Sequence, residues 1–193
     1  MLLKSTVVRV KPVCRWGALL ALIPLVVGCA STLRWARDTP SNPSCVPDRL
    51  LSWNDFTPRD AQSRRGAETA IRFHLDLTEP PRIQAQFDPE LSWVKPEVIN
   101  APDQKRADRL LRHEQVHFAI SCLLTRQANL ALRTGGDPKA MLLLLNAVAT
   151  RINVQYDVET NHGVNASDQA RWEEVIESSL AAGPLTSTVR IRD

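Results

Sequence analysis

The longest stretch of this chain without glycine or proline begins at residue 103 and contains the pattern His113-Glu114-Gln115-Val116-His117. The stretch is rich in helix formers, so it predicts one long helix, with Pro102 in its first turn and Gly135-Gly136 at its end. His113 and His117 are four residues apart and therefore lie one turn apart on the same face of that helix. Apolar residues around the pattern predict a buried helix, in which two imidazoles and a carboxylate need partners.

Two histidines at this spacing can bind one metal ion, and the glutamate between them then acts as a general base rather than as a ligand. A catalytic zinc ion has three protein ligands and an open position, at which it lowers the pKa of water. Glu114 would take the proton of the water that is activated in this way. Two imidazoles with a third imidazole or a carboxylate suit zinc best, so we expect Zn2+ as the cofactor. In the alternative interpretation these side chains lie on a solvated helix face without a metal.

The third ligand must come from another part of the chain, which contains four histidines. His74 alternates with apolar residues and is expected on the exposed face of a strand. His162 follows a second predicted helix and stands next to Gly163, which allows the backbone to approach closely. We therefore expect His162 as the third ligand, with the carboxylates of Glu159 and Asp157 as alternatives.

Tyr156 precedes this group of candidate ligands. One interpretation is that its hydroxyl donates a hydrogen bond to an oxyanion during acyl transfer. The other is a tyrosine half-buried at the end of a helix.

The order of the remaining elements predicts the fold class. Alternating apolar and polar residues predict strands over 69–77 and 83–87, and residues 91–94 are a third candidate. Asp137-Pro138 is typical of a helix start and predicts a second helix to about Tyr156. A third helix is expected from about Asp168 to Ala182. Strands followed by helices predict a single α+β domain, with a small N-terminal antiparallel sheet and three helices, the first of which carries the histidine pattern.

The N-terminal residues 1–28 have the layout of an export signal. They contain four basic residues and no acidic one: Lys4, Arg9, Lys11 and Arg15. The apolar run over 16–28 is short for a membrane span and typical of a secretory signal. Leu25-Val26-Val27-Gly28-Cys29 resembles the lipobox of bacterial lipoproteins, in which the cysteine carries lipid and becomes the first residue. The alternative is an ordinary signal peptide that contains a cysteine.

Three regions follow from this interpretation. We expect a lipoprotein signal over 1–28, a flexible tether over 29–48 that begins with lipidated Cys29, and one domain over 49–193. Ala30 after the cysteine favours a lipid anchor in the outer membrane, with the domain in the periplasm. Four of the 24 Lys and Arg residues and none of the 21 Asp and Glu residues lie in the signal, so the rest of the chain has a formal charge of −1. A chain of this charge without a basic stripe is not expected to bind nucleic acid.

Two cysteines remain beyond Cys29. In an oxidising compartment Cys45 and Cys122 form a candidate disulfide, and two buried thiols are the alternative. Cys122 is nine residues after His113, about half a turn around the helix, so it faces away from the metal site.

Several segments resemble the bacterial family described as predicted secreted zinc-dependent proteases, within the wider zincin group. The resemblance covers roughly 50–180 and lies in these segments: Trp53-Asn54-Asp55-Phe56, Phe87-Asp88-Pro89, Ser92-Trp93-Val94, His113 to Phe118, Tyr156 to Gly163, and Gln169 and Trp172 before Ile176. It implies a zincin-like fold with His113 and His117 as ligands and Glu114 as the general base. The His-Gly pair at 162–163 stands where the family repeats these residues.

From these features we expect an exported zinc metallopeptidase that hydrolyses peptide bonds of a peptide or protein substrate in the cell envelope. The alternative is an envelope lipoprotein that serves as a binding or assembly module with a structural metal. An open metal position favours catalysis, whereas a fourth protein ligand would close the site and favour a structural metal. A zinc amidase acting on cell-wall peptides shares the chemistry and differs in its substrate. The oligomeric state is not predicted by any of these features.

Overall fold

The long helix predicted around the histidine pattern is the central element of the structure. The computed structural model describes residues 45–46 and 50–182, and in it helix α3 spans Gln104–Arg133. Asp103 caps its start, because the side chain accepts a hydrogen bond from the backbone N–H of Arg106. Pro102 therefore lies just before the cap rather than in the first turn. Gly135 follows the helix end with a φ of +95°, a conformation that favours glycine.

Two small mixed sheets precede α3. In the first, of order β1-β5-β4, β5 (Arg82–Phe87) pairs antiparallel with β4 (Ile71–Asp76) and parallel with β1 (Cys45–Val46). In the second, β6 (Trp93–Val94) pairs parallel with β2 (Thr57–Pro58) and antiparallel with β3 (Ala67–Glu68). The expectation of one antiparallel sheet is therefore wrong. Two-residue strands carry no periodic pattern, so the sequence gives no sign of these parallel pairs.

The alternation expected in the longest strands is confirmed. Ile83, Ala85 and Phe87 are buried in β5, while Arg72 and His74 are exposed on β4. Leu77, expected on the buried face, is exposed because β4 ends at Asp76.

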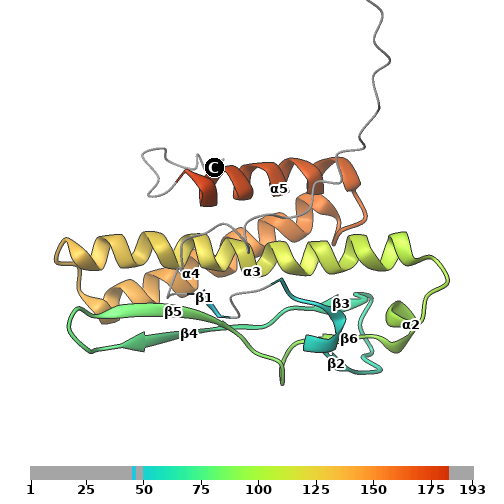
Figure 1. Cartoon of the computed structure of the whole chain (residues 1–193), viewed down its shortest axis with the longest axis horizontal. Helices are drawn as coiled ribbons and strands as arrows, with labels where there is room; N and C mark the ends of the chain where they lie inside the picture. The colour runs from blue at the N-terminus through green and yellow to red at the C-terminus, as the bar shows by residue number, and fades with distance from the viewer. Residues whose placement is uncertain (1–44, 47–49, 183–193) are drawn as a thin grey trace, which may run out of the picture. The chain divides into compact units, whose positions relative to one another are not determined.

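Two further long helices pack around α3. Helix α4 spans Pro138–Thr160, with Asp137 as its cap and proline in its first turn, and α5 spans Ala166–Ala181 with Asn165 as its cap. Two short elements precede α3: η1 (Trp53–Asp55) lies between β1 and β2, and α2 (Pro96–Ile99) lies between β6 and α3. Figure 1 shows the strands on one side of α3, with α4 beside α3 and α5 on the side away from the strands. The structure is thus mixed α+β with small sheets and three long helices, as expected.

Three apolar clusters hold these elements together, and α3 contributes to each. One lies between the helices and includes Val116, Ile120 and Ile176. The second lies between the middle of α3 and the strands and includes Leu51, Phe56 and Phe118. The third lies near the C-terminal end of α3 and includes Ile83, Leu132 and Leu145. Burial of an aliphatic or aromatic side chain stabilises the fold by roughly 1.5–3 kcal/mol. α3 is therefore held on several sides, which fixes the position of His113 and His117.

A disulfide between Cys45 and Cys122 joins β1 to α3, with 5.5 Å between the Cα atoms. Both the pairing and the outward direction of Cys122 agree with the sequence-based expectation. The two residues of β1 lie near the end of the segment expected as a tether, and the rest of that segment, Cys29 and the export signal lie outside the described residues. Among the described residues, no helix combines the length and the apolar character needed to cross a membrane.

Candidate metal centre

Three polar side chains from two helices converge on one point between α3 and α4. The Nε2 atoms of His113 and His117 lie 3.1 Å apart, and each lies 3.0 Å from Oδ1 of Asp157. The two histidines are almost fully buried, at 2% and 9% exposure. Asp157 comes from α4, which packs along α3. The expected helix spacing thus brings both imidazoles to one point, and Asp157 completes a group of three that could hold a metal ion.

A neighbouring residue on α4 fixes the orientation of His117. Asn153 Oδ1 lies 2.7 Å from His117 Nδ1, and the Asn153 amide nitrogen donates to the carbonyl of Ala149. Because the Asn153 oxygen accepts, His117 Nδ1 is the protonated nitrogen and Nε2 faces Asp157. A hydrogen bond of this kind to the outer nitrogen is typical of histidines that bind metals. Asn153 is one turn before Asp157, so both residues face α3 from the same side of α4.

His162 lies at the edge of this group. It follows α4 in a short loop, with a φ of +52°, and its Nδ1 is 3.3 Å from Asp157 Oδ1. Its side chain is 45% exposed, unlike the other two histidines. Gly163 has a φ of +80°, and a Cβ there would lie 3.1 Å from Cβ and Cγ of His113. The glycine therefore allows the loop to pass close to the site, as expected from the sequence.

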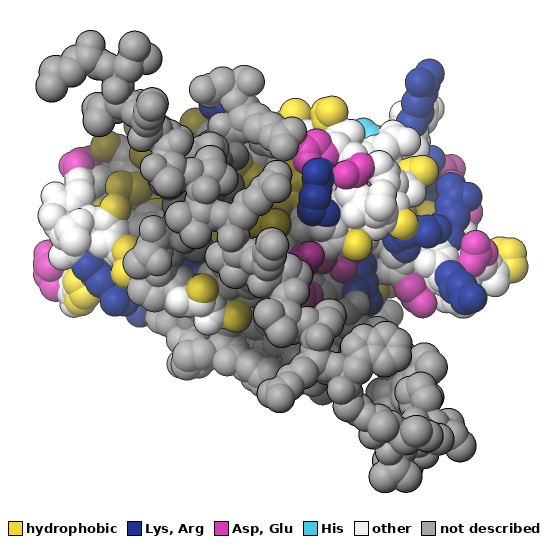
Figure 2. All heavy atoms as spheres, turned by 90° about the horizontal axis from the view of Figure 1, so that it is seen from above, with side chains coloured by type: hydrophobic (Ala, Val, Ile, Leu, Met, Phe, Trp, Pro, Cys, Tyr) yellow, Lys and Arg dark blue, Asp and Glu magenta, His cyan; other side chains and the backbone are white. Residues whose placement is uncertain are grey.

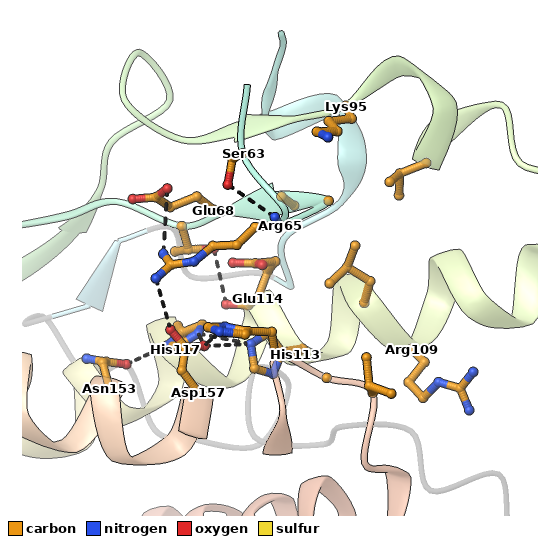
Figure 3. Close-up of a pocket in the computed structure, with 18 of the residues that line it drawn as sticks. Ser63, Arg65, Glu68, Lys95, Arg109, His113, Glu114, His117, Asn153 and Asp157 are labelled. Atoms are coloured by element: carbon orange, nitrogen blue, oxygen red, sulfur yellow. Dashed lines mark hydrogen bonds and ion pairs between the residues drawn. The ribbon is translucent and has the colours of Figure 1, made fainter. Parts of the chain in front are cut away.

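Glu114 lies beside the two histidines, with its side chain toward the cleft (Figure 3). Its backbone oxygen accepts a hydrogen bond from the Thr69 hydroxyl, so the strands contact the helix at this turn. The side chain is 3% exposed, and its Oε2 has no hydrogen-bond partner among the described residues. A buried carboxylate oxygen without a partner costs free energy, and such atoms in native proteins are found where a further group binds or reacts.

Tyr156 and Glu159 lie away from the cleft. Tyr156 is fully buried beneath the site; its ring stacks on His113 at 4.6 Å, and it does not line the cleft. Burial and the nearby charges of Glu173 and Glu114 raise the pKa of its hydroxyl. The interpretation of Tyr156 as an oxyanion donor is therefore not supported. Glu159 accepts hydrogen bonds from Trp172 and Arg171 on α5, so its carboxylate is directed away from the histidines.

The protonation of the three central groups follows from burial and from their mutual hydrogen bonds. Burial lowers the pKa of His113, and it prevails over the hydrogen bond with Asp157. Burial also acts against the charged form of His117, but the hydrogen bond with Asp157 and the charge of Glu114 outweigh it and raise the pKa. Burial disfavours the charged form of Asp157, but the hydrogen bonds from both histidines hold its pKa well below the usual range. The carboxylate is therefore ionised, as a metal ligand must be.

A cleft of about 1170 Å³ opens over this group. Its walls come from α3, α4 and the strands, and from the loop between β2 and β3. Arg65 of that loop reaches across the cleft: its guanidinium lies 3.7 Å from Glu68 and 3.9 Å from Oδ2 of Asp157. Figure 3 shows Arg65 across from the histidines, with the Glu114 side chain close to it.

The donor atoms fit a zinc ion in number, type and spacing. Zinc binds imidazole nitrogen and carboxylate oxygen at about 2.0–2.2 Å, so the ligands of a tetrahedral site lie about 3.3–3.5 Å from one another. The three donors here are 3.0–3.1 Å apart, and small outward shifts would accommodate the ion. The ionised carboxylate and the orientation of His117 by Asn153 also suit a metal site.

The comparisons with known proteins give no match: neither a family model, nor a curated protein, nor a solved structure resembles this chain closely enough to be reported.

The sequence did not identify two residues of the site, Asn153 and Arg65. Asn153 had a signal, because it is one helical turn before Asp157, but that signal depends on α4 continuing through Asp157. Arg65 lies in an arginine-rich loop, and nothing in the local sequence places this loop across the cleft from α4.

Proposed function

We propose that this protein is a zinc-dependent peptidase of the cell envelope, with His113, His117 and Asp157 as the metal ligands and Glu114 as the general base. The observation that carries the proposal is the orphaned carboxylate oxygen of Glu114, buried beside three converging donor atoms at the floor of an open cleft. A structural metal site has no need of such a group, whereas hydrolysis needs a base next to the attacking water. Three protein ligands leave one position for substrate and water.

Each residue has a distinct task in this mechanism. A zinc ion held by the two histidines and Asp157 would polarise a peptide carbonyl and make water more acidic. Glu114 takes a proton from the attacking water and passes it to the leaving amine. Asn153 accepts a hydrogen bond from Nδ1 of His117 and so favours the tautomer in which Nε2 carries the lone pair that would bind the metal. Burial of the two imidazoles keeps bulk water from competing for their nitrogens.

We assign to Arg65, in place of Tyr156, the stabilisation of negative charge on the carbonyl oxygen of the substrate. Arg65 lines the cleft, and its guanidinium is close enough to Asp157 to lie over the ligand group. A cation at this position would stabilise negative charge that develops on the carbonyl oxygen. It would also hold Asp157 Oδ2, so that Oδ1 remains directed at the histidines.

The remaining sequence-based expectations belong to the same proposal. They are the zincin-like fold, the relationship to predicted secreted zinc-dependent proteases, the lipid on Cys29 and the periplasmic location. Burial of His113 and His117 on one long helix, next to a small sheet, supports the first two. The disulfide between Cys45 and Cys122 supports export, because disulfides persist in oxidising compartments.

A second candidate function rests on the position of His162. Its Nδ1 is 3.3 Å from Asp157 Oδ1, so a small movement of the loop would bring a fourth donor to the metal. Four protein ligands would close the site and leave an envelope binding module with a structural metal.

The experiment that tests the proposal is elemental analysis of the purified protein after dialysis, followed by peptide hydrolysis assays of three variants. We expect about one zinc per chain. Glu114→Gln should keep the metal and lose hydrolysis, whereas Asp157→Asn should lose both. His162→Ala separates the two candidates: retained metal with altered hydrolysis supports the peptidase, and loss of the metal supports a four-ligand structural site. A folded protein that takes up no zinc would sink both.

A further inference from the structure

The two ends of the cleft carry different charge. At the end beside the N-terminal half of α4, most lining side chains are neutral, and they include Ile71, Phe73, Asn146, Ala149, Thr150 and Val154. Figure 3 shows Glu68 on this side of the cleft, and its carboxylate lies 3.7 Å from Arg65. At the other end, beside the start of α3, four basic side chains line the cleft: Arg64, Lys95, Arg106 and Arg109. The acidic side chain that lines this end is Glu97. Figure 3 shows Lys95 and Arg109 on opposite walls at this end, and Figure 2 shows Lys and Arg side chains, with acids among them, gathered at the same end of the molecule. The cleft is thus basic on one side of the metal centre.

The three arginines of this basic end are available to a ligand. Lys95 lies 3.7 Å from Glu97, so its charge is partly compensated. No ion pair within residues 50–182 involves Arg64, Arg106 or Arg109, and all three are exposed. The acids at the start of α3, Asp103 and Asp108, do not line the cleft.

The spacing of two of these arginines relates them to the reaction centre. Arg109 and Arg106 precede His113 by four and seven residues, so they lie on the same helix face, about 6 and 10 Å from it along the axis. An extended peptide advances about 3.3 Å per residue. A side chain two or three residues from a peptide bond held over His113 and His117 would therefore lie over these arginines.

We propose that the substrates are peptides with an acidic residue two or three positions from the scissile bond, on the side that lies over Arg106 and Arg109. This inference rests on the proposed function, since it takes the scissile bond to lie over the metal centre. The guanidinium group presents two parallel donors that match the two oxygens of a carboxylate, so arginine selects acidic side chains in geometry as well as charge. The neutral end of the cleft sets the direction in which such a chain lies.

The test measures binding separately from hydrolysis. The zinc-loaded Glu114→Gln protein is titrated, by fluorescence anisotropy at low salt, into a labelled octapeptide with two adjacent glutamates and into its twin with two glutamines. We expect about fivefold tighter binding of the glutamate peptide, the size that two exposed ion pairs give. Added Arg106→Gln and Arg109→Gln substitutions should abolish the difference. A matched control, Arg133→Gln with Arg151→Gln, removes the same charge from exposed positions that do not line the cleft and should preserve it.

Three outcomes would overturn the inference: equal binding of the two peptides, no binding of either, or a preference that persists in the Arg106→Gln, Arg109→Gln protein. A second measurement keeps the two proposals apart. The wild-type protein is incubated with a mixture of proteome-derived peptides, and cleavage sites are mapped by mass spectrometry. Cleavage without an acidic preference overturns the inference and leaves the peptidase. Selective binding of the glutamate peptide without any cleavage sinks the peptidase and supports acidic-peptide recognition by this end of the cleft.

Discussion

Helix α3 is buried on two sides that differ in the kind of side chains they contain. On the side toward the strands, Phe118 and Cys122 pack with Leu51, Phe56 and Phe87, and Cys122 is bound covalently to β1. Gln115, the polar residue on this side, donates its amide hydrogen to the carbonyl of Leu51. On this strand side apolar groups meet apolar groups and the Gln115 amide has a partner, while the buried indole nitrogen of Trp53 has none among the described residues.

The side toward α4 is more polar. Asp157 lies between His113 and His117, and Asn153, Arg65 and His162 lie around this group. His113 Nδ1, Glu114 Oε2 and the Tyr156 hydroxyl are buried without a hydrogen-bond partner among the described residues. Three unsatisfied atoms on residues of one site are unusual in a well-packed core. Apolar packing and the disulfide thus hold α3 from the strand side, whereas the α4 side carries a group of polar atoms that could hold a metal ion.

The largest effect is expected from removal of a ligand on the α4 side. His113→Ala and Asp157→Asn each leave two donors, so we expect loss of the tightly bound zinc and of all hydrolysis, measured by elemental analysis and a peptide assay. Circular dichroism should still show the helices, because the strand side is untouched. The matched control is His74→Ala, which removes an exposed histidine of β4. If both ligand variants kept their zinc, the α4 side of α3 would not be the metal site.

The next effect separates catalysis from metal binding. Glu114→Gln keeps the size of the side chain and removes its basicity, so hydrolysis should fall about 10²- to 10⁴-fold with zinc content unchanged. Glu174→Gln, an exposed residue of α5, is the control and should keep full activity. Full activity in the Glu114 variant would assign the base to another group.

The third prediction concerns the strand side. The double variant Cys45→Ala, Cys122→Ala should lower the free energy of unfolding by about 4 kcal/mol, because the disulfide closes a loop with a sequence separation of 77 residues. Chemical denaturation measures this loss. The folded variant should still bind one zinc, since the ligands come from the opposite side of α3. Zinc lost from a folded variant would show that the two sides are not independent.

The smallest effect is expected from the residue that orients a ligand. Asn153→Ala removes the acceptor for His117 Nδ1 and should weaken zinc affinity about 10- to 100-fold, measured by competition with a chelator. Asn146→Ala is the matched control, because its amide bonds only to the carbonyl of Leu142 in its own helix. Equal zinc affinities of the two variants would show that Asn153 does not orient His117 for metal binding.

The parts of this fold that the sequence predicts are those with local causes. Asp137-Pro138 marks the start of α4 through capping and proline geometry, and the spacing of His113 and His117 places them on one face of α3. The pairing of β1 with β5 and of β2 with β6 depends on residues far apart in the chain, and two-residue strands leave no local pattern. These two strand pairs could therefore be recognised only in the structure.

The end of α4 differs from the sequence-based expectation and bears on the choice of the third ligand. The sequence predicts that this helix ends near Tyr156, and His162, beyond this end and next to Gly163, is the expected third ligand, with Asp157 and Glu159 as alternatives. The helix continues to Thr160 and ends at Asn161 in the left-handed conformation. Asp157 is therefore one turn after Asn153 on the face toward α3, and its oxygen lies among the histidine nitrogens. Helix ends are set by the competition between backbone hydrogen bonds and local side-chain caps, which sequence periodicity resolves poorly.

The bond between Cys45 and Cys122 also has a topological consequence. It closes a covalent ring that contains every strand described here, the arginine-rich loop and both histidines of the centre. A single cut of the backbone inside this ring, for example in the exposed stretch around Arg64, opens the ring but leaves the two pieces joined through sulfur. After such a cut, the helix that carries His113 and His117 would thus stay covalently joined to the strands on both sides of the break.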